Sequence, residues 1–478
     1  MPDLPPSDLV THGREILDWL ARYLEHPERF PVVARTAPGE VRERLPASPP
    51  RTGESLADIL ADVERIIVPG LTHWNHPGFF AYFATSASVP GILGELLTAG
   101  LNVNAMLWKT SPAATELEQL ATEWLRQLLG LGDGWTGHIN DTASISTMLA
   151  IAAAREARPE LGIRERGMAG RRDLPRLRVY CSEHAHSSVD KACIALGLGH
   201  ENVVKVAADE AFRMRPDELA QRVAEDRARG DLPIACVATV GTTSTTSVDP
   251  VSAVADVCAR EAMWLHVDGA YAGVAAVVPE LRHVLDGVAR ADSLVVNPHK
   301  WLFTPVDCSV LYTRRPEVLM RAFSLVPEYL VTREQGEVVN LMDYGVQLGR
   351  RFRALKLWMV LRAFGSEGLA ERLRAHCALA RELASWVEAA SGWELCAPVP
   401  FSVVCLRHIP AGATPDEQDA ANMAILHRVN ESGEAYLSHT KLHGRVVLRV
   451  AIGNIRTERT HVERAWTLLR DAADAMDA

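Results

Sequence analysis

Lysine is the scarcest charged residue of this chain. Only six lysines, at positions 109, 191, 205, 300, 356 and 441, occur among the 50 Lys and Arg residues of the 478-residue sequence. Arginine therefore supplies nearly all of the positive charge. A position that keeps a lysine is a candidate for chemistry that needs a primary amine.

Other absences exclude whole classes of protein. No stretch has the length and apolar character of a spanning helix, and the first residues lack the basic and apolar regions of a signal peptide, so we expect no membrane association. The net charge is −10, without a basic stripe, which argues against a nucleic-acid partner. The eight cysteines form no CxxC pair. They indicate reduced thiols in a cytoplasmic protein.

Three stretches with different patterns follow one another along the chain. Residues 1–87 carry helical patterns joined by a proline-rich connector, which gives this segment little means of closing a core, so we expect it to pack on a second subunit. Residues 88–365 alternate helices with short apolar strands. Residues 366–478 carry a helix, two strands and a closing helix, which predicts a small α+β domain.

The middle stretch predicts the fold class. Continuous apolar strands separated by helices indicate an α/β fold with a mostly parallel sheet, covered by helices on both faces. These strands begin at Arg178, Ile234, Trp264, Ser293 and Cys308. Outside this stretch we expect helices over Leu9–Leu24, Leu56–Ile67 and Leu369–Ala390, strands over Phe401–Arg407 and Val446–Ile452, and a last helix from Thr457.

Lys300 stands at the end of the apolar strand that begins at Ser293, with Asn297 and His299 beside it. A lysine amine with a lowered pKa forms a Schiff base with a carbonyl, although a lysine at a strand end can also simply reach into water. Asp268 closes the preceding apolar strand, at the edge where open α/β sheets bind ligands. A Schiff-base lysine and an aspartate for a pyridinium nitrogen are what pyridoxal phosphate requires.

A phosphate group needs a cradle, and one candidate precedes an alanine-rich helix. Thr142 and Ser144 stand at the start of this helix, where backbone N–H groups and hydroxyls face an anion. The same pattern is also an ordinary helix cap, and Asp141 argues against a phosphate unless its carboxylate points away. A second helix start, with Ser111 before a proline and a Thr115/Glu118 capping box, predicts no chemistry.

Two further polar segments allow two interpretations each. His184 and His186 form an HxH pattern, but no third or fourth ligand is near in sequence, so we expect no metal. One of these imidazoles could lie over a planar cofactor or be a structural histidine. The hydroxyl-rich loop from Val240 to Thr246 follows a strand and reaches the same sheet edge, or is a plain polar loop.

Taken together and in this order, the motifs resemble the group II pyridoxal-phosphate-dependent decarboxylases, closest to the aromatic-L-amino-acid decarboxylases of dopa, tyrosine and tryptophan. The resemblance covers essentially the whole chain. Its segments are Thr72–Phe83, Ala185–Ser188, Val267–Gly273, Asn297–Trp301, Leu348–Lys356 and Leu448–Ile452. It implies pyridoxal phosphate (PLP) fold type I and a homodimer with the active site at the subunit interface.

The resemblance also implies roles for single residues. Lys300 would bind the cofactor covalently, Asp268 would keep its pyridine nitrogen protonated, and His186 would stack on the ring. Tyr329 matches the tyrosine that protonates the product carbon. Thr142, Ala143, Ser144 and Asn297 would hold phosphate, Ala270 would pack by the ring, and Thr243 and His299 would lie near the substrate carboxylate or the cofactor.

The substrate is expected to be an aromatic amino acid: tryptophan, tyrosine, dopa or phenylalanine. By resemblance the pocket residues are Trp74, Tyr82, Phe83, Thr85 and Gly349, with Asn104 and Met106 contributed by the partner subunit. Asn104 and Met106 replace an aliphatic and an aromatic residue of the animal dopa enzymes, which leaves the preferred substrate open. Asp141, Gly269 and Ala84 also depart from the family pattern.

Three other functions remain possible. A PLP-dependent aldehyde synthase shares the fold, but the related plant enzymes tend to carry other residues where this chain has Tyr329 and His186. A decarboxylase of glutamate or 2,4-diaminobutyrate is the second, although the signatures fit the aromatic branch better. The third is a degenerate scaffold, which would be expected to have lost Lys300 or Asp268.

Overall fold

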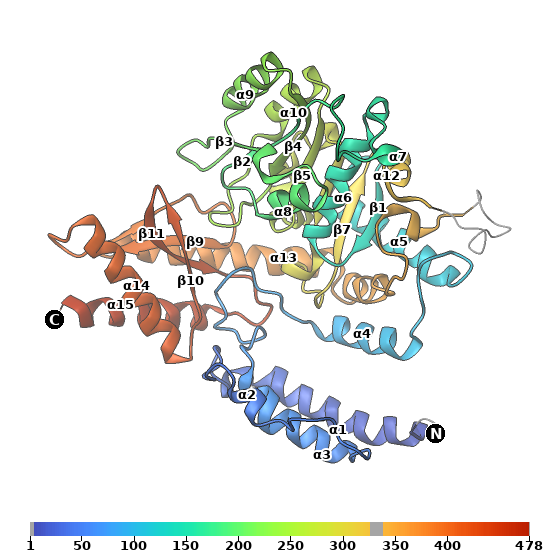
Figure 1. Ribbon diagram of the computed structural model, residues 1–478. Helices are drawn as coiled ribbons and strands as arrows, with labels where there is room; N and C mark the ends of the chain where they lie inside the picture. The colour runs from blue at the N-terminus through green and yellow to red at the C-terminus, as the bar shows by residue number, and fades with distance from the viewer. Residues whose placement is uncertain (1–3, 326–337, 478) are drawn as a thin grey trace. The chain divides into compact units, whose positions relative to one another are not determined.

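The computed structural model describes residues 4–325 and 338–477. The chain divides into two compact units (Figure 1). Unit 1 comprises residues 1–84, 385–396 and 406–478, and unit 2 comprises residues 85–384 and 397–405. The division at residues 87 and 365 stays a prediction of the sequence.

Unit 2 is built on a seven-stranded sheet with the order β1-β7-β6-β5-β4-β2-β3. Its strands are β1 (Thr136–Asn140), β2 (Leu177–Ser182), β3 (Val203–Val206), β4 (Leu232–Thr239), β5 (Trp264–Asp268), β6 (Ser293–Val296) and β7 (Ser309–Thr313). Only β7 runs against its neighbours among these strands, since it pairs antiparallel with both β1 and β6. The carboxyl ends of β2, β4, β5 and β6 therefore meet at one edge.

Both faces of this sheet are covered. Adjacent residues of a strand point to opposite faces, and in β2 the neighbours Val179, Tyr180 and Cys181 are all 0% exposed. One face packs on a core cluster to which α6 (Ala143–Glu156), α8 (Ser188–Ala195) and α12 (Pro316–Phe323) contribute. The predicted fold class, a mostly parallel α/β sheet between helices, is confirmed.

The remaining helices of unit 2 are α4 (Val89–Leu101), α5 (Pro112–Leu128), α7 (Ile163–Arg166), α9 (Pro216–Ala228), α10 (Val251–Arg260), α11 (Pro298–Trp301) and most of α13 (Ala354–Ala389). The stretch α13 consists of two helices that join at Gly365, whose φ of 64° and ψ of 174° are not helical. The second of these helices corresponds to the predicted helix from Leu369. Glycine adopts this positive φ without a steric penalty, so the glycine marks the boundary between the two helices.

The start of α5 differs from its prediction in a second way. Ser111 caps the helix, because its side chain accepts a hydrogen bond from Ala114 N. The predicted Thr115/Glu118 capping box is wrong. Glu118 is buried and instead accepts from Arg350 Nη2 at 2.7 Å and from Ile139 N at 2.8 Å. Leaving the buried Arg350 without a carboxylate would be strongly destabilising. Glu118 therefore pairs with Arg350 and does not cap the helix.

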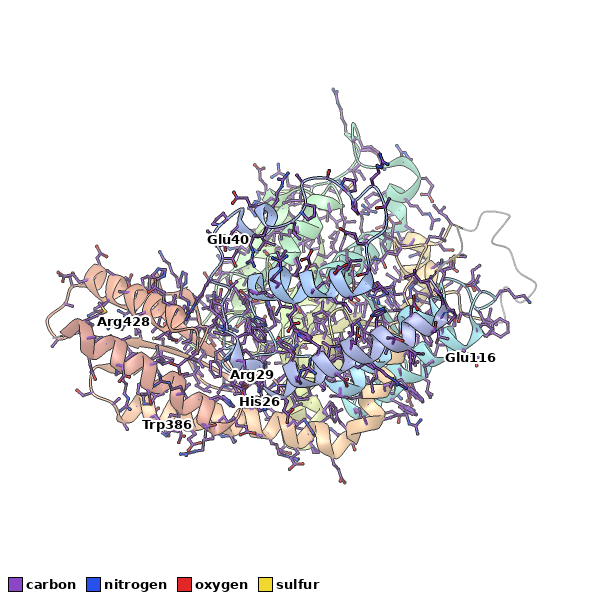
Figure 2. The ribbon with its side chains drawn as sticks, turned by 90° about the horizontal axis from the view of Figure 1, so that it is seen from below. His26, Arg29, Glu40, Glu116, Trp386 and Arg428 are labelled. Atoms are coloured by element: carbon purple, nitrogen blue, oxygen red, sulfur yellow. The ribbon has the colours of Figure 1, made fainter. Side chains whose placement is uncertain are left out.

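Unit 1 holds a smaller sheet with the order β10-β11-β9-β8. Its strands are β8 (Trp393–Leu395), β9 (Val403–His408), β10 (Ser438–Leu442) and β11 (Arg445–Ala451), and its helices are α1 (Pro6–Glu25), α2 (Glu40–Glu43), α3 (Leu56–Asp62), α14 (Pro415–Ser432) and α15 (Arg459–Asp477). The predicted strands near 401–407 and 446–452 are confirmed as β9 and β11. Figure 2 shows His26 and Arg29 just after α1, Arg428 on α14, and Trp386 in the last turns of α13.

The described helices include none with the length and apolarity needed to cross a lipid bilayer. Helix α1 has no buried residue, and Leu9 and Val10 on it are 73% and 55% exposed. Within unit 2, α4 exposes Leu93, Leu96, Leu97 and Leu101 in the same way.

One close approach in unit 2 tests the packing of α4 on α13. A Cβ added at Gly94 would lie 2.6 Å from the Cα of Lys356, whereas a Cβ at Gly100 in the same helix would meet nothing within 4 Å. We expect Gly94→Ala to lower the free energy of unfolding by about 1–3 kcal/mol through overpacking. Gly100→Ala should be neutral or stabilising, because alanine favours helix.

Thermal unfolding of both variants checks this expectation. Equal melting temperatures for Gly94→Ala and Gly100→Ala would show that the two helices separate without cost at this position.

Candidate active site

Asp268 and Lys300 meet at the carboxyl edge of the sheet of unit 2. Asp268 is the last residue of β5 and pairs in register with Val295 of β6. Lys300 lies in α11, which begins two residues after β6 ends. Because β5 and β6 are parallel neighbours, their carboxyl ends bring the carboxylate and the amine to the same edge.

Asp268 is held by the backbone, and a buried histidine lies on the same strand face. Its side chain is 6% exposed, and its Oδ1 accepts a hydrogen bond from Ala270 N at 3.0 Å. His266, two residues earlier on the same face of β5, is fully buried and bonded to Ser293 Oγ at 2.9 Å. Burial lowers the pKa of His266 to about 4 against the opposing effect of Asp268. His266 is therefore neutral at pH 7.

His186 responds to both Asp268 and Lys300. It follows β2, and its Nδ1 accepts a hydrogen bond from Ser188 N at 3.1 Å. Burial lowers the pKa of His186, the Asp268 carboxylate opposes that shift, and the Lys300 ammonium adds to it. The imidazole, the carboxylate and the amine thus share one electrostatic environment. His184, the other histidine of the HxH pattern, instead contacts the ring of Phe212.

Asn297 and His299 form a buried pair beside Lys300. His299 Nδ1 accepts from Cys308 N at 2.9 Å, so the neutral ring carries its proton on Nε2, which lies 3.3 Å from the Asn297 amide. Burial lowers the pKa of His299 to about 3, and Lys300 adds to the shift. The Asn297 atom next to this Nε2 is Nδ2, and Asn297 Oδ1 has no partner among the described residues. Two N–H donors would then face each other, so we assign the amide the other way round. Its oxygen then accepts from this Nε2–H, and its NH₂ group takes the position without a partner.

The start of α6 is open to an anion. Thr142 is the cap residue of this fourteen-residue helix, yet its side chain makes no capping bond to it. Asp141 Oδ1 accepts from Thr142 N at 2.5 Å and from Thr142 Oγ1 at 3.2 Å, and Gln347 Nε2 donates to the other carboxylate oxygen at 3.4 Å. Asp141 is thereby occupied by donors. The first-turn N–H groups of Ala143 and Ser144 remain for a ligand.

The loop after β4 presents one hydroxyl. Thr242, Thr245 and Ser247 are buried and bonded to one another at 2.8–3.0 Å. Thr243 is exposed. Asp249 anchors the loop by accepting from Met214 N and Thr239 N, both at 2.7 Å, and burial raises the pKa of Asp249 to about 6. Three hydroxyls of this loop, those of Thr242, Thr245 and Ser247, therefore stabilise the loop itself.

Three of the predicted substrate residues lie together in unit 2. Asn104 Oδ1 accepts from Arg350 N at 3.0 Å, and Asn104 Nδ2 donates to Met106 Sδ at 3.5 Å. A Cβ at Gly349 would stand 3.8 Å from the same Nδ2. Thr85 is half-buried in unit 2, and no contact joins it to these three in the described residues.

The other predicted substrate residues lie in unit 1. The rings of Trp74 and Tyr82 stack with centroids 6.0 Å apart, and the Tyr82 hydroxyl lies 3.3 Å from that of Tyr436. Arg449 lies over the Phe83 ring, 4.6 Å from its centroid. Tyr329, predicted as a proton donor, lies outside the described residues.

Comparison with known proteins identifies the family. The sequence pattern of the pyridoxal-dependent decarboxylase conserved domain matches residues 38–409. The chain belongs to the pyridoxal-dependent decarboxylases. The predicted family, enzyme class and cofactor are confirmed.

Individual relatives extend over the whole chain. Tyrosine decarboxylase 4 of Petroselinum crispum is 40% identical, and the alignment covers 100% of this chain and 95% of that protein. Phenylacetaldehyde synthase of Arabidopsis thaliana is also 40% identical, covering 98% and 97%. The crystal structure of Oryza sativa TDC with PLP and tryptamine superposes with a TM-score of 0.96 at 38% identity, covering all of both chains.

The residues at the sheet edge fit pyridoxal phosphate. The open first turn of α6 and the NH₂ group of Asn297 suit a phosphate, and Asp268 and Lys300, which lie at the same sheet edge, suit a pyridine nitrogen and an aldehyde. In the described part of the chain, no group of three His, Cys, Asp or Glu side chains suits a metal ion.

Sequence reasoning missed three supporting residues: His266, Gln347 and Asp249. The sequence indicated only that His266 lies within an apolar strand. Because it stands two residues before Asp268, both side chains lie on the same face of that strand, and this spacing could have identified it. Gln347 donates a hydrogen bond to Asp141, and Asp249 accepts one from Met214 N; both contacts join residues that are far apart in the sequence. No local signal marks them.

The buried histidines predict how stability responds to pH. Burial lowers the pKa of His138 to about 3 in the folded protein, whereas the unfolded value is near 6.5. Below about pH 6.5 the unfolded chain binds a proton that the folded chain refuses, so stability falls by about 1.4 kcal/mol per pH unit for this group, until the folded pKa is reached. We expect His138→Gln to flatten the loss of stability between about pH 6 and pH 4.

The matched control is His427→Gln, at an exposed position on α14. Denaturant unfolding at several pH values gives the slope of the unfolding free energy against pH. The comparison uses this slope and not the absolute stability of each variant. A His138→Gln slope equal to that of the control would contradict the proton linkage.

Proposed function

We propose that this protein decarboxylates an aromatic L-amino acid, among tryptophan, tyrosine, dopa and phenylalanine, to the arylalkylamine and CO₂. The observation that carries the proposal is the meeting of Asp268 and Lys300 at the ends of adjacent parallel strands, in a chain related over its full length to a tyrosine decarboxylase. The aromatic residues Trp74, Tyr82 and Phe83 suit a planar side chain.

Six residues are proposed to bind the cofactor or to pack beside it. Lys300 would bind it covalently through the ε-amine, and the phosphate would be held by the α6 turn of Thr142, Ala143 and Ser144 together with Asn297. Ala270, at the carboxyl edge of β5, would pack beside the ring. When bound, the cofactor supplies a pyridinium that draws the electron pair out of the Cα–carboxylate bond as CO₂ leaves.

The surrounding side chains set the protonation states. Asp268 would keep a proton on the pyridine nitrogen, which its 6% exposure favours because a dry carboxylate strengthens that ion pair. His186 would stack on the ring. His299, with its pKa lowered by burial, stays neutral and adds no positive charge beside Lys300. Neutral His299 and Thr243 would face the substrate carboxylate or the cofactor.

Two residue sets are proposed for proton delivery and substrate choice. Tyr329 would deliver the proton to the substrate Cα after CO₂ has left. Asn104 and Met106 of the partner subunit, together with Trp74, Tyr82, Phe83, Thr85 and Gly349, are proposed to contact the substrate side chain. Because Gly349 carries no side chain, it would leave room for an indole or a catechol.

A homodimer is also proposed. The exposed leucines of α4, and the absence of any buried residue on α1, leave apolar surface that a second subunit would cover. The eight cysteines, all of which lie in the described residues, form no disulfide there, which favours a cytoplasmic location. Sedimentation of the full chain should give twice the chain mass, and a monomer at micromolar concentration would contradict the dimer.

The function predicts matched product yields. Amine and CO₂ should form in equal amounts from an aromatic amino acid, while glutamate and 2,4-diaminobutyrate should give neither, because the pocket residues offer no cationic group for an acidic chain and no carboxylate for a basic one. Lys300→Ala should lose turnover by several orders of magnitude, whereas Lys205→Ala, at an exposed lysine of β3, should retain it. Turnover of glutamate alone would overturn the aromatic assignment.

A second function is favoured by one observation, the equal identity to a phenylacetaldehyde synthase. Such an enzyme would consume O₂ and release aldehyde, CO₂, ammonia and hydrogen peroxide. Since Tyr329 is proposed to protonate Cα, the unmodified chain should make amine.

Tyr329→Phe removes that proton donor. We expect amine to fall sharply while aldehyde, ammonia and peroxide appear in air, because the unprotonated carbon is then open to oxygen. Product analysis under air and under argon separates the two outcomes. An unchanged amine yield would mean that the proton comes from another group.

A further inference from the structure

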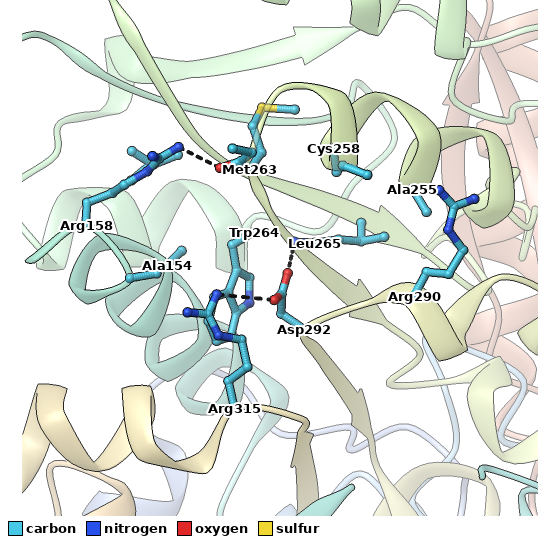
Figure 3. Close-up of a pocket in the computed structure, with 14 residues that line it drawn as sticks. Ala154, Arg158, Ala255, Cys258, Met263, Trp264, Leu265, Arg290, Asp292 and Arg315 are labelled. Atoms are coloured by element: carbon cyan, nitrogen blue, oxygen red, sulfur yellow. Dashed lines mark hydrogen bonds and ion pairs between the residues drawn. The ribbon is translucent and has the colours of Figure 1, made fainter. Parts of the chain in front are cut away.

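The sheet of unit 2 carries a second cavity at the edge opposite the active site. About 390 Å³ in volume, it lies at the amino ends of β4, β5 and β6 (Figure 3). Trp264 begins β5 and Asp292 immediately precedes β6, whereas Asp268 and Lys300 stand beyond the other ends of these strands. Cavities of this size hold small organic molecules.

The floor of the cavity is formed by apolar side chains. Ile234, Trp264 and Leu265 line it from the strands, and each is at most 4% exposed. Met263 and Cys258 complete the floor, and Ala154 and Ala255 form walls on α6 and α10. Such a surface suits a planar apolar group.

The rim is cationic. Three arginines, Arg158, Arg290 and Arg315, line the cavity against one carboxylate, Asp292. Arg315 lies over the Trp264 ring, 5.3 Å from its centroid, and Figure 3 shows Arg158 and Arg315 among the residues that line this cavity. A guanidinium stacked on an aromatic face keeps its N–H edge for a carboxylate or phosphate.

The arginines are incompletely neutralised. Arg158 donates to the Ala262 carbonyl at 2.6 Å and has no carboxylate partner in the described parts of the chain. Arg315 lies 3.6 Å from Asp292 and 3.8 Å from Glu317, too far for a strong hydrogen bond. Only Arg290 has a close partner, Asp256 at 2.7 Å. Arg158 and Arg315 thus retain donors for an added anion.

We propose that this cavity is a second ligand site, for a small aromatic carboxylate without an amino group. The anion would lie between Arg158 and Arg315, and the ring would lie on the floor formed by Trp264, Ile234 and Met263. The cationic rim disfavours an arylalkylamine. The site is independent of the proposed function, because none of its residues belongs to the active-site edge.

Calorimetry of the cofactor-loaded enzyme tests the proposal with three probes: indole-3-acetate, inorganic phosphate and tryptamine. Indole-3-acetate should bind more tightly than either of the others. The Arg158→Gln/Arg315→Gln variant should weaken this binding by at least about tenfold, since each charge-assisted hydrogen bond contributes strongly. Arg222→Gln, an exposed arginine of α9 outside the cavity, is the control and should leave the affinity unchanged.

A second variant blocks the cavity without removing charge. Ala259 is an exposed lining residue on α10, so Ala259→Trp should fold normally and abolish binding. The KM for the aromatic amino acid should stay unchanged in all these variants, which separates this site from the active site.

Three results would overturn the proposal. The first is indole-3-acetate affinity unaffected by the double arginine variant and by Ala259→Trp, which would assign any binding to the active site. The second is phosphate binding as tight as indole-3-acetate, which would mean that the apolar floor contributes nothing. The third is tryptamine binding, lost in Ala259→Trp, that is as tight as the binding of indole-3-acetate, or no binding of any probe.

Discussion

The parallel pairing of β5 with β6 is the constraint on which the rest of the site depends. It aligns Asp268 with Val295, so the two chain segments that continue from these strands carry a carboxylate and an amine to one edge. A slip of one residue would turn Asp268 to the other face of the sheet. The buried neighbours on both faces, such as Leu294 and Val295 at 0% exposure, hold this register firmly.

The same pairing places a hydrogen-bonded row of side chains behind the site. Ser293 Oγ accepts from Trp264 Nε1 at 2.9 Å and lies at the same distance from His266 Nδ1. Trp264 forms the floor of the second cavity, and His266 shares a strand face with Asp268. One strand of five residues therefore connects the two edges of the sheet.

Buried cationic side chains of unit 2 have a carboxylate partner close in space. Arg350 is neutralised by Glu118, and Lys356, at 0% exposure, pairs with Glu95. Histidines that lack such a partner are kept neutral by burial, as for His299 with its pKa lowered to about 3. Lys300 and Asp268 are two charged residues at the active-site edge. At the opposite edge, Arg315 and Arg290 lie within 4 Å of carboxylates, whereas Arg158 has no carboxylate partner in the described part of the chain.

The sequence by itself determined the apolar strands β2, β4, β5, β6, β7, β9 and β11 and the positions of Lys300, Asp268 and His186, because these depend on local periodicity and on residue chemistry. The strands β1, β3, β8 and β10 were not predicted. Tertiary structure alone decided how Glu118 is used, how Gln347 and Thr142 engage Asp141, and which arginines gather around Trp264. Each of these contacts joins residues far apart in the chain, or depends on what surrounds them. Local pattern carries no information about such partners, since a buried charge takes whichever counterpart the packing brings near.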